Sequence, residues 1–181
     1  MGKDGRLAEP KTLTHFETVL LPHLAAAYNL ARWLTRNDHD AEDLVQEAYL
    51  RAFKSFDGFR GGDGRGWILA IVRNTCYTSL QQNRSQEVAE VFDEEVHTVE
   101  DHSRSPEAVL LQSVDAQLLR EALEKLPVEF REILVLRELE GMSYREIADL
   151  AGIPVGTVMS RLARGRGHLQ RELTHPVKKE T

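Results

Sequence analysis

The residues with the clearest chemical use lie near the C-terminal end of the chain, between positions 155 and 164. An arginine can hydrogen-bond two acceptors of one guanine, while Thr and Ser can bond phosphates or base edges. A helix that begins just after Pro154 also offers free backbone N–H groups to a phosphate. We therefore predict a DNA-contacting face made of Val155, Gly156, Thr157, Ser160, Arg161 and Arg164.

The spacing before this face is that of a helix-turn-helix. Small Ala148 lets two helices cross closely, Gly152 can take the positive φ of a tight turn, and Val158 is an apolar plug. Ser143 and Glu146 form a capping box that opens the first of the two helices. The alternative is a helical hairpin with a solvated basic face, which the capping box, the Gly-Ile-Pro turn and the basic final helix together disfavour. Because repressors, activators and recombinases share the motif, it indicates DNA binding and little more.

Two sets of helices must position these residues. In the second half, the signals predict a helix from Ser105-Pro106 to about Lys125 and another from Val128 to Leu139, ended by Gly141. The capping box opens a third helix, and a fourth follows Pro154 to about Leu173. In the first half, apolar spacing predicts the helices Thr14–Thr35, Ala41–Phe56 and Trp67–Gln82.

Details of the first half are also predicted. Leu24 belongs to the apolar stripe of the first helix, and Pro22 can shift the start of that helix. The glycine-rich stretch Gly58–Gly66 is expected to be a loop. For Trp67 we favour core packing over stacking on a base, because Ile71 shares its helix face.

Charge is segregated along the chain, whose formal net charge is −6. Between Glu87 and Glu107 eight acidic residues accompany one base, whereas residues 155–181 carry six bases and two acids. The acidic stretch has no sustained apolar periodicity, so residues 86–105 are interpreted as a partly disordered linker. The fold class expected is all-α: two small helical domains joined by a flexible acidic linker, the second a four-helix domain with a helix-turn-helix.

Composition excludes several classes of protein. No apolar run approaches a membrane span, the N-terminus has no signal-peptide pattern, and Cys76 has no second cysteine to pair with. A cytoplasmic location without membrane insertion is expected. Paired carboxylates, a nucleophile motif and metal-spaced His/Cys clusters are lacking, and even the nearest histidines, His97 and His102, make a poor metal site. We therefore predict no enzyme, no catalytic residue, no cofactor and no metal.

The order of short motifs along the chain resembles the extracytoplasmic-function (ECF) RNA polymerase sigma factors, from about His15 to Leu173. The matching stretches in the first half are Asp40-Ala41-Glu42-Asp43-Leu44-Val45-Gln46-Glu47, Phe53, Trp67-Ile68 and Ile71-Val72-Arg73-Asn74. Those in the second half are Leu126-Pro127, Arg131-Glu132, Ser143-Tyr144, Glu146-Ile147-Ala148, Gly156-Thr157-Val158 and Ser160-Arg161-Leu162. The chain also departs from the family pattern: Gly165 and Gly167 stand where better helix formers are usual, each at a cost of about 1 kcal/mol of helix propensity.

The resemblance implies a division of labour. Residues 12–85 would form a region 2 domain that docks on the polymerase clamp and recognises the promoter −10 element, and 106–175 a region 4 domain that recognises the −35 element, with 86–105 as the linker. The docking residues implied are Asp40, Glu42, Asp43, Gln46 and Glu47. The residues implied for the −10 region are Arg60, Arg65, Arg73, Asn74 and Arg84.

The implied partners are core RNA polymerase, through the clamp of its largest subunit and the flap of its second-largest, promoter DNA, and an anti-sigma factor. Two alternatives stay open at this point. The acids of the docking helix could simply compensate the dipole at its N-terminus. The whole chain could be a stand-alone helix-turn-helix repressor or activator, although the net charge of −6 disfavours strong binding to DNA alone.

Overall fold

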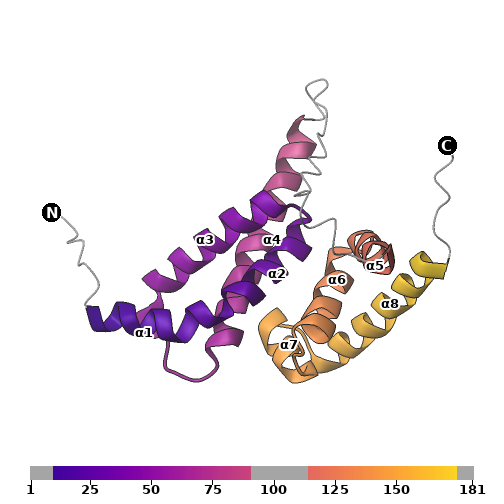
Figure 1. Ribbon diagram of the computed structural model, residues 1–181. Helices are drawn as coiled ribbons and strands as arrows, with labels where there is room; N and C mark the ends of the chain where they lie inside the picture. Colours follow the sequence, from indigo (N-terminus) through magenta and orange to yellow (C-terminus); the bar gives the residue numbers. More distant parts are fainter. Residues whose placement is uncertain (1–9, 91–113, 175–181) are drawn as a thin grey trace.

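The computed structural model describes residues 10–90 and 114–174, with side chains from 12–85 and 116–174. The regular structure of these residues is helical, in two small domains that lie side by side (Figure 1). The first domain consists of α1 (Pro10–Leu20), α2 (Leu24–Thr35), α3 (Asp38–Lys54) and α4 (Gly64–Glu90), with 3₁₀ turns at Leu21–His23 and Phe56–Gly58. The second consists of α5 (Val114–Glu124), α6 (Val128–Leu134), α7 (Tyr144–Ala151) and α8 (Val155–Thr174). The all-α, two-domain expectation is confirmed.

The first domain is built around α2, α3 and α4, which pack on one another. Leu30 and Leu34 of α2 and Ile68 of α4 are fully buried. At one end an aromatic cluster joins α1, α3 and the start of α4: Phe16, Tyr49, Phe53, Phe56, Phe59 and Trp67. The Trp67 ring lies 5.1 Å from that of Phe59, so core packing of Trp67 is confirmed.

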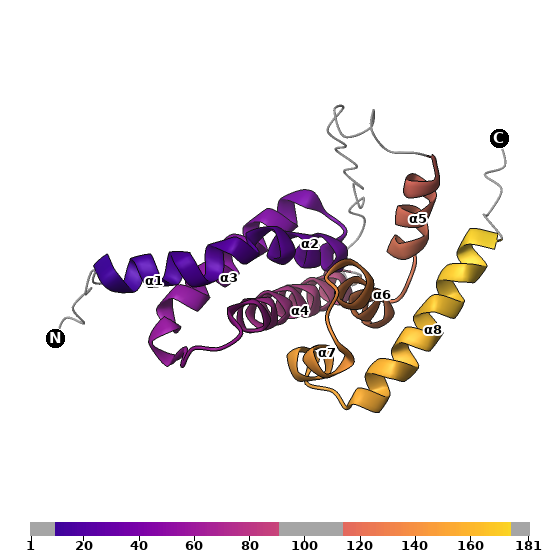
Figure 2. The same cartoon turned by 60° about the horizontal axis from the view of Figure 1, so that its bottom comes forward.

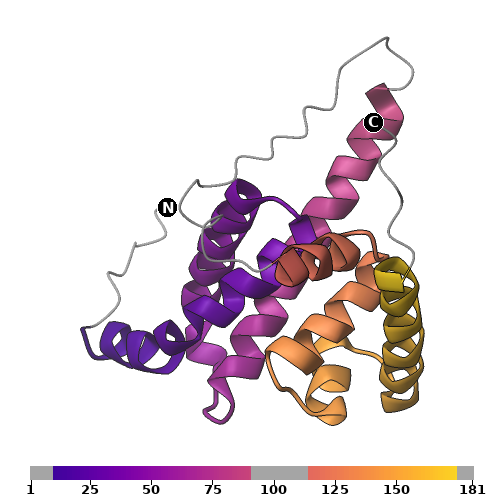
Figure 3. The ribbon, with the colours of Figure 1, turned by 45° about the vertical axis from the view of Figure 1, so that its right-hand side comes forward.

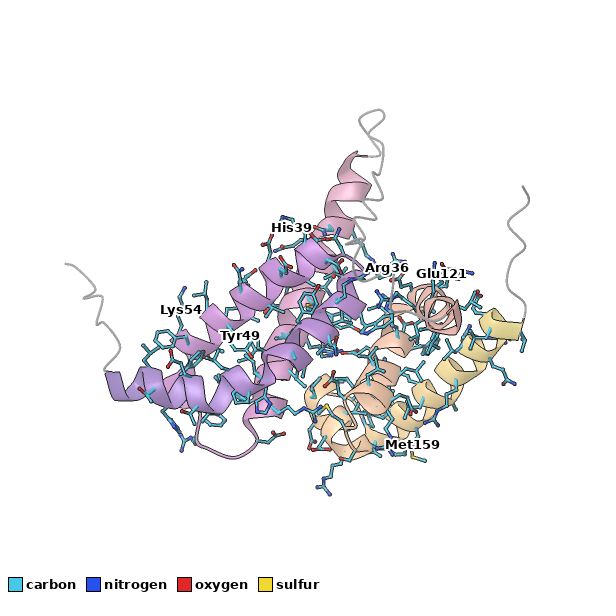
Figure 4. All side chains as sticks on the ribbon, viewed as in Figure 1. Arg36, His39, Tyr49, Lys54, Glu121 and Met159 are labelled. Atoms are coloured by element: carbon cyan, nitrogen blue, oxygen red, sulfur yellow. The ribbon has the colours of Figure 1, made fainter. Side chains whose placement is uncertain are left out.

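The single helix expected over Thr14–Thr35 was wrong. Pro22 lies in a 3₁₀ turn, where its missing N–H and fixed φ separate α1 from α2. The break rotates the following residues, so that Leu24 is 46% exposed instead of joining the buried stripe. Tyr49 braces the junction, since its hydroxyl donates to the carbonyl of Leu20 at 2.9 Å. Figure 4 shows Tyr49 on α3, facing the region where α1 gives way to α2.

The glycine-rich loop is shorter than expected, because α4 already begins at Gly64. A Cβ at Gly64 would lie 2.7 Å from Cγ1 of Val19, so glycine here allows the start of α4 to touch the end of α1. The true loop keeps Gly61 and Gly62, which have φ values of +82° and +97°. The other end of α4 was also misjudged: the helix continues to Glu90, into the expected linker 86–105. The rest of that linker lies outside the described residues.

The second domain follows its predicted helices closely. The start expected at Ser105-Pro106 lies outside the described residues, and α5 is seen from Val114. The predicted helix Val128–Leu139 is α6 plus one π-helical turn, Val135–Leu139. Gly141 follows with φ +66°, as a helix-ending glycine should.

The two domains contact each other directly. α4 packs against α7, and α2 packs against α6 and the π turn. Figure 2 and Figure 3 show the same arrangement from two further sides, with α3 and α8 on opposite outer sides of the molecule. The faces of α2 and α4 that meet the second domain are therefore covered, while α3 and α8 keep an outward face.

Candidate nucleic-acid interface

α7 and α8 form the predicted helix-turn-helix. The hydroxyl of Ser143 accepts from the backbone N–H of Glu146 at 3.2 Å, and the Glu146 carboxylate accepts from the N–H of Ser143 at 2.6 Å. Hydrogen bonding of the carboxylate with the side chain and the backbone N–H of Ser143 holds the pKa of Glu146 below its usual value. Gly152 ends α7 with φ +66°. Val158 is fully buried, so the predicted capping box, turn and plug are all confirmed as geometry.

The outward face of α8 carries most of the residues proposed to contact DNA. Val155, Gly156, Ser160 and Arg164 are exposed, whereas Thr157 and Arg161 are half-buried. The inward side is anchored by Leu162, which is 1% exposed. Met159 is 54% exposed on the same outward side and was not among the predicted residues (Figure 4). Its exposure follows from helix geometry, because Met159 lies on the side of α8 that carries Ser160 and not on the buried side that carries Val158 and Leu162.

Gly165 has a structural reason that its helix propensity does not show. It is buried where α8 crosses α6, and a Cβ there would lie 3.1 Å from Cδ1 of Leu134 and 3.4 Å from Cβ of Phe130. Gly167, by contrast, has nothing within 4 Å of its Cβ position. The close approach of α6 and α8 therefore depends on the first glycine and not on the second.

The residues proposed for the −10 region do not share one environment. Arg60, Asn74 and Arg84 are exposed along the loop and α4. Arg65 and Arg73 instead turn toward the second domain, where both are paired with glutamates. The structure thus brings three of the five to solvent and covers the other two.

Arg73 forms a two-point ion pair with Glu132 of α6. Its Nε donates to Oε1 of Glu132, and its Nη2 donates to Oε2 at 3.3 Å. The Tyr77 hydroxyl donates to the same Oε2 at 2.8 Å, and the Arg73 guanidinium lies over the Tyr77 ring. Burial raises the pKa of Tyr77, the Glu132 charge raises it further, and the charge of Arg161 on α8 opposes this. Arg161 is half-buried, and its charge acts on this cluster.

Two further glutamates make similar contacts. Glu140 accepts from Nη2 of Arg65 at 2.9 Å and from the amide of Asn29 at 3.4 Å. Glu124 accepts from Nη2 of Arg32 at 3.5 Å. We call Glu124, Glu132 and Glu140 the glutamate row. Sequence patterns do not reveal this row, because its partners are distant in the chain. Arg65 and Asn29, for example, lie 75 and 111 residues from Glu140.

Backbone contacts add to the boundary between the domains. Nη1 of Arg36 donates to the carbonyl of Glu124 at 3.3 Å, and Figure 4 shows Arg36 at the end of α2, beside α5. Buried Arg131 donates from Nη1 to the carbonyl of Leu126 at 3.0 Å, within its own domain. Its Nη2 reaches the carbonyl of Leu34 in the first domain at 3.5 Å.

α3 presents the acids proposed for docking. The first turn is capped by Asn37, whose side chain accepts from the N–H of Asp40 at 3.0 Å. Glu47 pairs with Arg51 one turn on. The five proposed docking residues are all exposed on this helix: Asp40, Glu42, Asp43, Gln46 and Glu47. The acids of the first turn lie where they also compensate the helix dipole, so both interpretations of them fit the geometry.

Other chemistry is not indicated in residues 10–90 and 114–174. Among them no group of three or more His, Cys, Asp or Glu side chains could hold a metal ion. None of the described helices is long and apolar enough to cross a membrane. Cys76 is fully buried, and burial raises the pKa of its thiol to about 12. This supports a packed thiol rather than a redox sensor.

Comparison with known proteins gives matches over both domains. The family models "Sigma-70 region 2" and "Sigma-70, region 4" match residues 20–86 and 116–169. The chain is 36% identical to the ECF RNA polymerase sigma factor SigE of Mycolicibacterium smegmatis over 155 residues, which are 86% of this chain and 60% of that relative. It is 34% identical to the ECF RNA polymerase sigma-E factor of Haemophilus influenzae over 151 residues, 80% of this chain and 79% of the relative.

A solved structure is similar over both domains. It is the co-crystal structure of the sigma factor RpoE with the anti-sigma factor NepR from Bartonella quintana, matched with a TM-score of 0.72 and 30% identity. The match covers 92% of this chain and 99% of that sigma factor.

Proposed function

This chain belongs to the ECF RNA polymerase sigma factors, and from that premise we propose that it binds core RNA polymerase and directs promoter-specific initiation. Residues 12–85 are the proposed region 2 domain, with α4 extending it to Glu90, and 106–175 are the proposed region 4 domain. Region 2 would dock on the clamp of the largest subunit and recognise the −10 element. Region 4 would recognise the −35 element and contact the flap of the second-largest subunit. The protein would act in the cytoplasm, as a binding subunit and not as an enzyme.

One observation supports this function most directly: α8 is anchored on one side and open on the other. Val158 and Leu162 are buried, while Gly156, Ser160 and Arg164 are exposed on the opposite face. A recognition helix needs both properties, since its N-terminal residues must reach base edges in the major groove while its inner face is fixed. Arg164 and Arg161 would bond guanine or phosphate there.

α3 supports the polymerase half of the proposal. Its exposed acids would meet basic residues of the clamp, a complementarity that guides association and register more than raw affinity. Asp43 and Glu47 lie one helical turn apart, and Glu47 already shows the ability to pair with an arginine.

The −10 element would be held by the first domain. Asn74 offers both a donor and an acceptor to the edge of an unstacked base. Arg60, Arg65, Arg73 and Arg84 would neutralise backbone phosphates. A partner of the anti-sigma class is also proposed, because the similar RpoE was solved in complex with such a protein.

The test is multi-round transcription with purified core RNA polymerase, this protein and a pool of the host's promoter fragments. Specific transcripts that are absent with core polymerase alone would support the proposal and give both promoter elements by alignment. If no transcript appears but the protein alone shifts free DNA sharply, the stand-alone repressor hypothesis replaces it.

A further inference from the structure

The glutamate row occupies arginines that the proposed function needs for DNA. Each of its three members comes from the second domain, and each is bound by an arginine of the first: Arg32, Arg73 and Arg65 in chain order of the glutamates. Two of these three, Arg65 and Arg73, belong to the proposed −10 set. The contact between the domains is thus made with the same groups that would neutralise phosphates.

A carboxylate and a phosphate compete for one arginine on equal geometric terms. The guanidinium fork binds either anion through two parallel N–H···O bonds. At Arg73 both donors are used on Glu132, and the pair is shielded: the Arg73 side chain is 15% exposed and that of Glu132 is 0% exposed. DNA cannot replace Glu132 at this arginine while the domains stay together.

The contact between the domains covers some of the proposed binding surfaces and leaves others exposed. α3 keeps its acids exposed, and α8 keeps Gly156, Ser160 and Arg164 exposed, on opposite outer sides of the molecule (Figures 1, 2 and 3). Only the side of α2 and α4 that carries Arg32, Arg65 and Arg73 is turned inward. The surfaces proposed for polymerase and for the −35 element therefore stay open in this form, whereas Arg65 and Arg73 of the −10 set do not.

The two domains can also separate at this boundary. A buried ion pair contributes little net stability, because the desolvation of both charges offsets their attraction. When the domains part, Glu132 and Arg73 regain water or new partners. Both domains contain fully buried apolar residues, such as Leu30 and Ile68 in the first and Val158 and Leu162 in the second.

Resting on the proposed function, we propose that this chain inhibits itself: the glutamate row stands in for promoter phosphates on Arg65 and Arg73, so that −10 DNA binds only after the domains separate. No partner protein is needed for this closed form. Single-stranded DNA and the glutamate row are mutually exclusive ligands of the same arginines.

The first test compares two double variants that remove the same charge. Glu132→Gln with Glu140→Gln weakens the glutamate row, whereas Glu138→Gln with Glu172→Gln removes two glutamates that pair inside the second domain, with Arg166 and Lys125. The probe is a fluorescein-labelled, random-sequence single-stranded DNA of about 20 nucleotides, followed by anisotropy at fixed salt. We expect the first variant to bind at least about fivefold more tightly than the second, as a larger open fraction requires.

The second test uses the protein with its glutamate row unchanged. Donor and acceptor dyes are placed on exposed α3 and α8 positions through His39→Cys and Gln170→Cys, since buried Cys76 stays unlabelled. We expect energy transfer to fall when saturating single-stranded DNA is added, and to be low from the start with the row variant. If that variant does not fold, the response of the unaltered chain to DNA decides.

Equal DNA affinities of the two folded variants, or energy transfer that DNA does not change, would overturn the self-inhibition. Neither measurement contains polymerase. A failure of the transcription assay would therefore count against the proposed function alone, and a failure here against the closed form alone.

Discussion

The guanidinium of Arg73 and the carboxylate of Glu132 are joined at two points although 59 residues separate them in the chain. Glu132 is completely buried, and its other partner, the hydroxyl of Tyr77, also comes from the first domain. The charge of Glu132 is thus satisfied by groups that reach it only when the two domains are in contact. Substitutions at this point should report on the domain boundary rather than on either core.

Tyr77→Phe isolates one bond of this cluster. The ring and its contact with the Arg73 guanidinium are kept, while the 2.8 Å hydrogen bond to Glu132 is lost. We expect the free energy of unfolding in urea to fall by about 1–2 kcal/mol, because a buried carboxylate loses a donor. Tyr28→Phe is the matched control, since its hydroxyl contact with Asp38 is long, at 3.5 Å, and exposed. Equal losses of unfolding free energy in the two variants would show that the hydrogen bond from the Tyr77 hydroxyl to Glu132 contributes no more than the exposed contact of Tyr28.

Arg164→Ala tests the outward face of α8. Arg164 is exposed and has no structural task in the core, so the fold should be unchanged while promoter recognition weakens. Loss of one arginine contact to a base costs about 1–3 kcal/mol, so transcription from −35-dependent promoters should fall about tenfold. Arg171→Ala, two turns further along the same helix, is the control for lost charge. If both variants transcribe alike, α8 does not recognise DNA through its N-terminal half.

Gly165 and Gly167 should respond in opposite ways to substitution. Gly165→Val forces α8 away from Leu134 and Phe130, and we expect a loss of about 2 kcal/mol or more in the free energy of unfolding. Gly167→Ala meets open space and gains helix propensity, so it should stabilise the protein by about 0.5–1 kcal/mol. Thermal unfolding followed by circular dichroism measures both. A stabilising Gly165→Val would mean that α6 and α8 do not approach as described.

Cys76 should be inert in the folded protein. Burial raises the pKa of its thiol to about 12, so near pH 8 almost none of it is the reactive thiolate. We expect labelling by a thiol reagent to be at least about a hundredfold slower than for the urea-unfolded chain, and to follow the unfolding transition. Cys76→Ser should also leave any response to oxidant unchanged. Fast labelling of the native protein would instead point to a redox role.

Structural features that depend on residues close together in the sequence were predicted best. The capping box at Ser143, the turn at Gly152 and the plug at Val158 depend on residues no more than about ten positions apart, and all three were found where they were expected. Helix ends were less well predicted. Pro22 was noticed, but its effect on Leu24 depends on how α2 sits on α3 and α4, which is a matter of tertiary packing.

The residues that were missed belong to contacts between distant segments. Glu132 was noted only as part of a motif, and nothing near it in sequence indicates that Arg73 is its partner. Gly165 was taken as a simple loss of helix propensity, because the side chain that needs its space, Leu134, lies in another helix. Patterns of three to seven residues cannot register such relationships, since they arise only when helices are brought together.

Glu146 gives the fold a predictable response to acid. Hydrogen bonds from the side chain and backbone of Ser143 favour its charged form and lower its pKa below the usual value. A carboxylate whose pKa is lowered by folding stabilises the protein above its unfolded pKa, and this contribution disappears as pH falls through the folded value. Glu146→Gln can keep the capping box without a titrating group. Between about pH 5 and about pH 3, urea unfolding should therefore show a steeper loss of stability for the wild type than for Glu146→Gln. Parallel pH profiles would mean that the charge of Glu146 contributes nothing to its cap, and that the start of α7 depends on the hydroxyl of Ser143 alone.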